Sequence, residues 1–194
     1  EYYLGLYKTS IAIVGQIMGL VTAATTSILF SSLSRLQTDE AAFQNLFFKF
    51  QKLVGILVIP LGVGMFCYSG LLTEVLLGSQ WSDASGFVGL WGLMSAITIV
   101  LSHYSSEVYR AKGRPRLSVL VQWLHIIVLW PTLLIAVKHG FEVLYTARAL
   151  VRIESILVNR VVTSLAVHMS SWKTIKTISV SCFAALLMSL ASYG

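Results

Sequence analysis

Four charged side chains interrupt the apolar segment at residues 146–167: Arg148, Arg152, Glu154 and Arg160. On insertion scales a charged residue at the centre of a membrane helix costs about 2.5–3.5 kcal/mol, while each Leu or Ile contributes only about 0.3–0.6 kcal/mol in return. Four such charges facing lipid would cost on the order of 10 kcal/mol, which the neighbouring apolar residues barely offset. We therefore expect these side chains to face water or polar groups.

The spacing of the polar residues indicates which surface that is. At about 100° per residue, Arg148, Arg152, Ser155 and Asn159 fall on one narrow stripe of a helix, with Tyr145 at its border. The opposite side is Val, Leu and Ala, so the stripe should face the protein interior. Two arginines at i and i+4 repel each other unless they share an anion, and guanidinium groups match phosphate oxygens bidentately. The stripe therefore predicts a cavity that binds a phosphorylated substrate.

Each of these charges also has a structural explanation. Arg148 and Arg160 can snorkel toward opposite membrane surfaces, and a carboxylate such as Glu107 can hold Arg152. Glu154 points away from the stripe, so it needs its own partner, either in a structural ion pair or as a proton-coupling group.

Two histidines lie inside apolar stretches. His103 shares a helix face with Glu107, which predicts either a proton relay or a capping or interhelix bond. His125 stands alone and is expected to be a hydrogen-bonded packing residue.

Composition places these residues in a membrane protein. The chain has 194 residues, of which 56% are hydrophobic and only 11% charged, and its mean hydropathy is +0.79. Soluble domains have about 25% charged residues, so most of this surface must face lipid. The net charge of +6 lies mainly between apolar runs, which argues against nucleic acid as a partner. Cys67 and Cys182 form no disulfide or metal-ligand pattern, and we expect no cofactor and no metal.

The hydropathy pattern predicts an all-α, polytopic membrane helix bundle, because lipid-exposed backbone must satisfy its own hydrogen bonds. Six stretches have the roughly 20 residues needed to span the hydrocarbon core. They lie near 10–33, 53–73, 86–108, 117–137, 142–166 and 174–193. The five connectors hold 3, 0, 4, 1 and 2 Lys or Arg residues in order, so the positive-inside rule places both chain ends outside. The chain starts without Met and ends in an apolar run, and we expect it to be part of a longer protein.

Several local features refine this prediction. The segment "TDEAAFQNLFFKFQK" is amphipathic and is expected to lie along the cytoplasmic interface, with simple extension of the next helix as the alternative. Asp39 and Glu40 suit its N-terminus. Pro60 and Pro131 should kink their spans. Gly15 and Gly19 should allow a neighbouring helix to approach closely. The tryptophans should mostly lie near span ends, at the membrane interface: Trp81, Trp91, Trp123, Trp130 and Trp172.

Five stretches resemble a known family in order and spacing: "YLGLYKTSIAI", "ILFSSLSRLQTDEAAF", "IPLGVGMF", "VLLGSQW" and "YRAKGRPRL". The family is the polysaccharide transporters, the Wzx-type flippases of lipid-linked oligosaccharides, whose superfamily also contains multidrug and toxic-compound extruders. Beyond about residue 120 the resemblance is one of hydropathy and span order only.

The resemblance implies the C-terminal lobe of a two-lobed exporter in the bacterial inner membrane. It implies transport of undecaprenyl-diphosphate-linked oligosaccharide for O-antigen, lipopolysaccharide or exopolysaccharide biosynthesis, with membrane lipids and other polysaccharide-assembly proteins as further partners. On this interpretation Arg148 and Arg152 hold phosphate, while Tyr145, Ser155 and Asn159 offer hydrogen bonds to sugar. A multidrug cation antiporter, a membrane enzyme acting on lipid-linked sugars and a structural subunit are the alternatives; carboxylates are scarce and no catalytic spacing is visible, so we expect a non-enzyme.

The charge pattern makes a prediction about topology. A cysteine at position 80 should react with an impermeant thiol reagent from outside the cell, and one at position 113 only from inside. The reverse labelling pattern would overturn the orientation.

Overall fold

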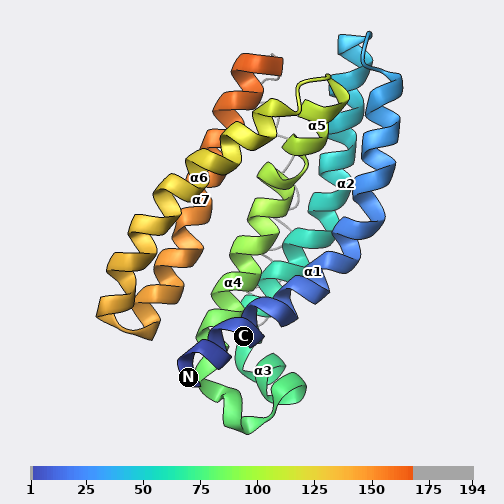
Figure 1. Cartoon of the computed structure of the whole chain (residues 1–194). Helices are drawn as coiled ribbons and strands as arrows, with labels where there is room; N and C mark the ends of the chain where they lie inside the picture. The colour runs from blue at the N-terminus through green and yellow to red at the C-terminus, as the bar shows by residue number, and fades with distance from the viewer. Residues whose placement is uncertain (1, 168–194) are drawn as a thin grey trace.

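The computed structural model describes residues 2–167, which form an all-α membrane helix bundle (Figure 1). The elements in order are α1 (Tyr2–Arg35), α2 (Glu40–Cys67), α3 (Ser69–Leu77), the 3-10 helix η1 (Ser79–Ala84), α4 (Ser85–Thr98), the π-helix η2 (Ile99–His103), α5 (Ser105–Ala111), α6 (Arg116–Ala136), the 3-10 helix η3 (Val137–His139) and α7 (Phe141–Val167). The predicted span near 174–193 and Trp172 lie outside the described residues.

Four stretches are long and apolar enough to cross a membrane: Tyr2–Arg35, Glu40–Cys67, Ser79–Ala111 and Arg116–His139. The fifth long helix, α7, has 27 residues, enough to cross as well, but its charged residues set it apart from those four. The predicted spans near 10–33 and 142–166 each lie within one helix, and the one near 117–137 covers α6 and the first residue of η3. The predicted span near 53–73 instead runs from α2 across Tyr68 into α3, and the one near 86–108 covers α4, η2 and part of α5.

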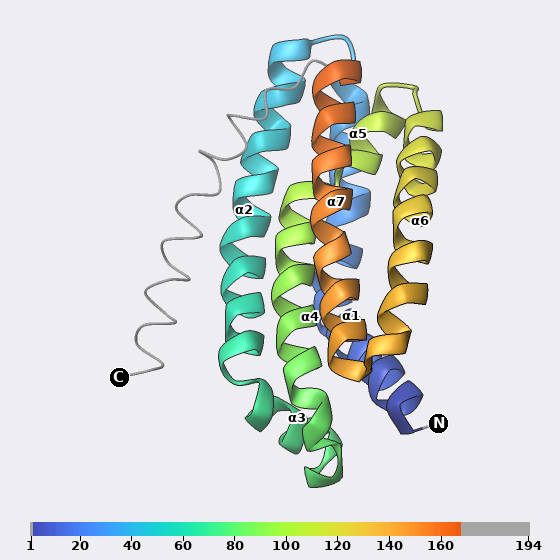
Figure 2. The same ribbon diagram turned by 90° about the vertical axis from the view of Figure 1, so that its left-hand side faces the viewer.

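The basic turns lie together at one end of the bundle. Figures 1 and 2 show the α1–α2 turn, the α5–α6 turn and the end of α7 at one end, with α3 and the α6–α7 turn at the other. Lys112 Nζ joins the two basic turns by donating to Glu40 Oε2 at 2.6 Å and to the Gln37 carbonyl at 3.2 Å. Successive connectors thus lie at opposite ends of the bundle, as the charge pattern requires. The side of the membrane that each end faces stays a prediction.

The amphipathic segment before the second span is part of that span. The prediction of a separate interfacial helix is wrong, because α2 runs without a break from Glu40 to Cys67. Phe43 and Phe47 are buried against other helices and do not face lipid. The start of the helix is as predicted: Asp39 caps it, with a side-chain oxygen accepting from the Ala42 N–H at 3.0 Å.

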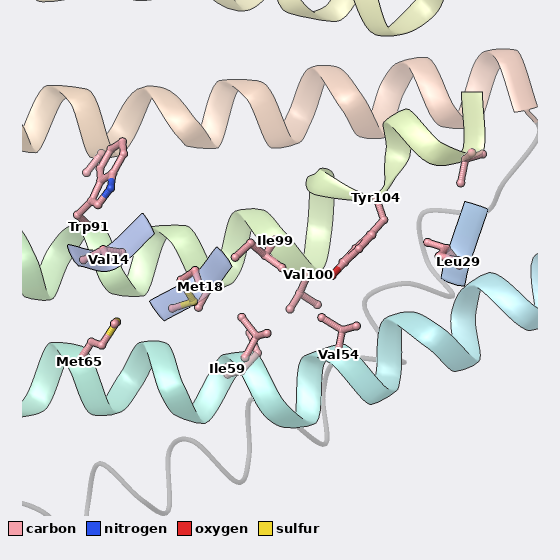
Figure 3. Packing of buried hydrophobic residues seen from close by; sticks show 14 of the residues in the cluster. Val14, Met18, Leu29, Val54, Ile59, Met65, Trp91, Ile99, Val100 and Tyr104 are labelled. Carbon is pink, nitrogen blue, oxygen red and sulfur yellow. The ribbon is translucent and has the colours of Figure 1, made fainter. Parts of the chain in front are cut away.

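Small residues bring α2 and α4 into close contact. A Cβ on Gly62 would lie 2.3 Å from the Ala96 Cβ, and one on Gly92 would lie 2.8 Å from Met65. Figure 3 shows apolar side chains of this interface, with Ile59 and Met65 of α2 pointing toward α4 and η2. This interface fixes the helix that carries one wall of the cavity described below.

One other sequence prediction, on the packing of α1, turns out differently. Gly15 and Gly19 of α1 make no close helix contact among the described residues, because a Cβ at either position would meet no heavy atom within 4 Å. Both glycines instead line a cavity. Pro60 and Pro131 lie inside α2 and α6, both helices continue through them, and the kinks expected there stay a prediction.

The close approach at Gly62 predicts that Gly62→Ala destabilises the bundle. The added methyl group must push α2 and α4 apart, and overpacking of this kind costs about 1–3 kcal/mol. Thermal unfolding in detergent should therefore show a lower Tm for Gly62→Ala, whereas the control Gly15→Ala should match or exceed the parent protein because Ala favours helix. Equal Tm values for the two variants would contradict the packing seen here.

Candidate functional site

The residues of α7 divide between an apolar outer face and a polar inner face. Apart from Glu142 at its start, the exposed large side chains of this helix are apolar: Val143, Leu150, Ile153, Leu157, Val161 and Leu165. Arg148, Arg152 and Ser155 lie on the other side and are only partly exposed. The predicted stripe thus faces the other helices, and its charges avoid the surface that would contact lipid.

The inner face borders a cavity of about 410 Å³. The cavity is lined from α1 by Ile11, Val14, Gly15, Met18, Gly19 and Thr22, from α4 and η2 by Trp91, Ser95, Thr98, Ile99 and His103, from α6 by Gln122 and His125, and from α7 by Arg148, Arg152 and Ser155. A second cavity of about 310 Å³ adjoins it and extends toward α5. The two share Thr98, His103, Gln122, His125 and Ser155 in their walls. Among the described residues, neither wall contains Asp or Glu.

The two arginines rest against α4. Arg152 Nη1 donates to the Ser95 hydroxyl at 2.8 Å, and its Cζ lies 3.6 Å from the centroid of the Trp91 ring. Arg148 Cζ lies 5.0 Å from the same centroid. Within residues 2–167 neither arginine forms an ion pair with a carboxylate. Glu107, the carboxylate considered for Arg152, instead pairs with Arg110 at 3.1 Å.

The partner of Glu154 is His125. Its Oε2 lies 3.0 Å from His125 Nδ1, and both side chains are largely buried between α6 and α7. The prediction of a hydrogen-bonded packing role for His125 is therefore right, although this residue also lines both cavities.

The structure separates the predicted His103–Glu107 pair. His103 ends the π-helix η2 and is exposed toward both cavities, whereas Glu107 is buried in α5 and bonds to Arg110. No hydrogen bond joins His103 to Glu107 in the described part of the chain, so this geometry provides no direct relay between them.

Of the predicted sugar-binding residues, one lies away from the cavities and another lines a cavity but is already hydrogen-bonded. Tyr145 lies outside both cavities, with its ring stacked on Phe87 at a centroid distance of 5.4 Å. Asn159 lines the second cavity but is buried, and its Nδ2 already donates to Ser102 Oγ at 2.7 Å and to the Ser155 carbonyl at 3.0 Å. Ser155 alone of the three combines a cavity position with an exposed edge.

The third span contains an interruption that sequence reasoning missed. The π-helix η2 separates α4 from α5, and π-helical turns frequently occur at functional sites. Its Val100 carbonyl accepts from Gln51 Nε2 of α2 at 2.6 Å, and its Leu101 carbonyl accepts from Arg160 Nη2 of α7. Arg160 therefore bonds to backbone inside the bundle. These bonds hold the segment whose Ile99 and His103 form part of the cavity wall.

Trp91 and Ser95 are the site residues that the sequence did not reveal. Trp91 is buried inside the bundle and not at a span end as predicted, while Trp123 and Trp130 are exposed on α6. The i, i+4 spacing of Trp91 and Ser95 was the available signal, since it places both on one face of α4. Which helix that face meets depends on tertiary packing.

No group of three or more His, Cys, Asp or Glu residues that could hold a metal ion occurs within residues 2–167.

Comparison with known families agrees with the resemblance noted above. Residues 1–86 match a family model described as polysaccharide biosynthesis protein. The chain is therefore similar to the polysaccharide transporters in the broad sense. The match covers α1 to η1 and so includes the α1 wall of the cavity, while the arginines of α7 lie beyond it. Searches of curated proteins and of solved structures return no match.

The bonds around η2 predict that Gln51→Leu destabilises the bundle. The substitution removes the donor to the Val100 carbonyl, and an unsatisfied buried group costs about 1–3 kcal/mol. Gln16→Leu is the matched control, because Gln16 is exposed on α1. Thermal unfolding in detergent should give a lower Tm for Gln51→Leu than for Gln16→Leu; the opposite order would show that the Gln51 bond is dispensable.

Proposed function

We propose that the chain is part of a flippase that moves undecaprenyl-diphosphate-linked oligosaccharide across the bacterial inner membrane during surface polysaccharide biosynthesis. The observation that carries this proposal is the pair Arg148 and Arg152, which lines a cavity in an apolar bundle and has no carboxylate partner among the described residues. Such a pair is stabilised by an anion with several oxygens, and a diphosphate is one. The similarity of residues 1–86 to polysaccharide biosynthesis proteins supports the same substrate class.

The proposed roles follow the geometry of the two cavities. Arg148 and Arg152 bind the diphosphate, and the uncharged polar residues Ser155, Gln122 and His103 hydrogen-bond the sugars. The polyprenyl tail stays in lipid against apolar helix faces. The wider protein is a multi-pass transporter, of which this chain supplies one lobe, and it works with other polysaccharide-assembly proteins and without enzymatic chemistry or a cofactor.

Of the three coupling candidates, the geometry favours Glu154. It is held by His125, a residue that lines both cavities. A proton gained or lost by this pair would therefore change the charge beside the substrate. Glu107 is engaged by Arg110, and His103 has no carboxylate bonded to it in the described region.

The cavity walls argue against the multidrug alternative. A cationic drug would need carboxylates to receive it, whereas the charged residues in the described walls are two arginines.

The proposal predicts that Arg152→Ala abolishes surface polysaccharide in cells that depend on the full-length protein. Loss of one charge-assisted contact costs about 1.5–3 kcal/mol, which corresponds to roughly a tenfold to hundredfold loss of substrate affinity. Polysaccharide on the cell surface and protein in the membrane fraction should be measured together. The control is Arg116→Ala, which removes the same charge from the start of α6, outside both cavities. Normal polysaccharide in correctly inserted Arg152→Ala would remove the anion-binding role.

A further inference from the structure

One indole ring contacts both cavity arginines. Trp91 lies on α4, and the Cζ atoms of Arg152 and Arg148 lie 3.6 Å and 5.0 Å from its ring centroid. One turn further along α4, Ser95 accepts a hydrogen bond from Arg152 Nη1 at 2.8 Å. The α4 helix thus presents a cradle of one aromatic ring and one hydroxyl group to two guanidinium groups of α7.

The cradle is itself held by an aromatic cluster. Trp91 is 3% exposed, and its ring packs on Phe87 at a centroid distance of 5.6 Å. Phe87 is fully buried and stacks against Tyr7 of α1 at 5.3 Å and against Tyr145 of α7 at 5.4 Å. Figure 3 shows the Trp91 ring rising from α4 toward α7. The indole is therefore buried and packs on a ring that Tyr7 of α1 and Tyr145 of α7 hold in place, which restricts its movement.

The shared ring offsets a repulsion between like charges. Arg148 and Arg152 are one turn apart on α7, where two cations repel each other, and no carboxylate within residues 2–167 pairs with either. The negative face of an indole attracts a guanidinium group, most strongly where water is excluded. Trp91 therefore keeps both cations at the cavity wall when no anion is bound. Within the described residues the two guanidinium groups form one hydrogen bond, from Arg152 to Ser95. Their remaining N–H groups are therefore available to bind an anion.

We infer that Trp91 is a positioning residue that presets Arg148 and Arg152 as a two-fork clamp, so that the cavity selects a diphosphate over a monophosphate headgroup. Each fork binds two oxygens of one phosphate group, so two adjacent phosphate groups occupy both forks. A single phosphate group occupies one and leaves the other cation uncompensated. This inference rests on the proposed function, since it assigns selectivity to the same cavity.

The inference is tested by binding to the full-length protein in nanodiscs. Isothermal titration with farnesyl diphosphate and farnesyl monophosphate gives the ratio of the two Kd values, and inorganic pyrophosphate as a third probe separates headgroup recognition from insertion of the tail. The parent protein should bind the diphosphate at least about tenfold more tightly. Trp91→Leu should bring this ratio close to one, while Trp91→Phe, which keeps an aromatic face, should retain part of it.

Two further variants separate positioning from general damage. Trp130→Leu removes an indole that is 63% exposed on α6, and it should leave the ratio unchanged. Arg148→Ala keeps the indole but removes one fork, so it should lower the ratio to the Trp91→Leu value, and the double variant should lower it no further. This non-additivity also tests the inference if Trp91→Leu alone is too unstable to purify, because Trp91→Phe can replace it in the cycle.

The outcomes distinguish the two proposals. If the parent protein binds none of the three probes, the anion-binding role under the proposed function fails. If it binds diphosphate and monophosphate equally, or if the Trp91 variants keep the parent ratio, the positioning role of Trp91 is overturned while the flippase proposal stands.

Discussion

The π-helical turn η2 lies within a segment that is apolar enough to cross a membrane. Two of its backbone carbonyls, those of Val100 and Leu101, accept hydrogen bonds from side chains of other helices. Lipid supplies no hydrogen-bond donor, so such groups must be satisfied by protein. Gln51 of α2 and Arg160 of α7 provide the donors, and Asn159 of α7 adds a bond to Ser102. This requirement ties α2, the interrupted span and α7 together, and the cavity lies beside the resulting polar junction.

The same solvent constraint explains how the bundle treats its charges. Glu154 and Glu107 each have a bonded partner, His125 and Arg110 respectively. Arg148 and Arg152 are stabilised differently, by an indole face and a hydroxyl group, which lower the cost of a cation without neutralising it. On the proposed function, a site that takes up and releases an anion needs this intermediate state. A carboxylate partner would compete with the substrate, and an apolar surrounding would expel the charge.

Glycines have two different effects on packing in this bundle. Between α2 and α4, glycines at positions 62 and 92 allow the two helices to pack closely. Along α1, the glycines at positions 15 and 19 leave open space that belongs to the cavity. The absence of a side chain therefore serves opposite purposes on two helices, and residue type alone does not distinguish them.

The sequence by itself determined that the chain is a membrane protein, that its fold is all-α and that the inner face of α7 is polar, because hydropathy and helical period are local properties of the chain. It also determined the Asp39 cap, which depends on residues three apart. Only the tertiary structure decided that the segment before the second span packs inward, that Tyr145 belongs to an aromatic cluster and that Trp91 contacts both arginines. Each of these facts depends on which helix faces which, and that choice is made by packing between residues far apart in the chain.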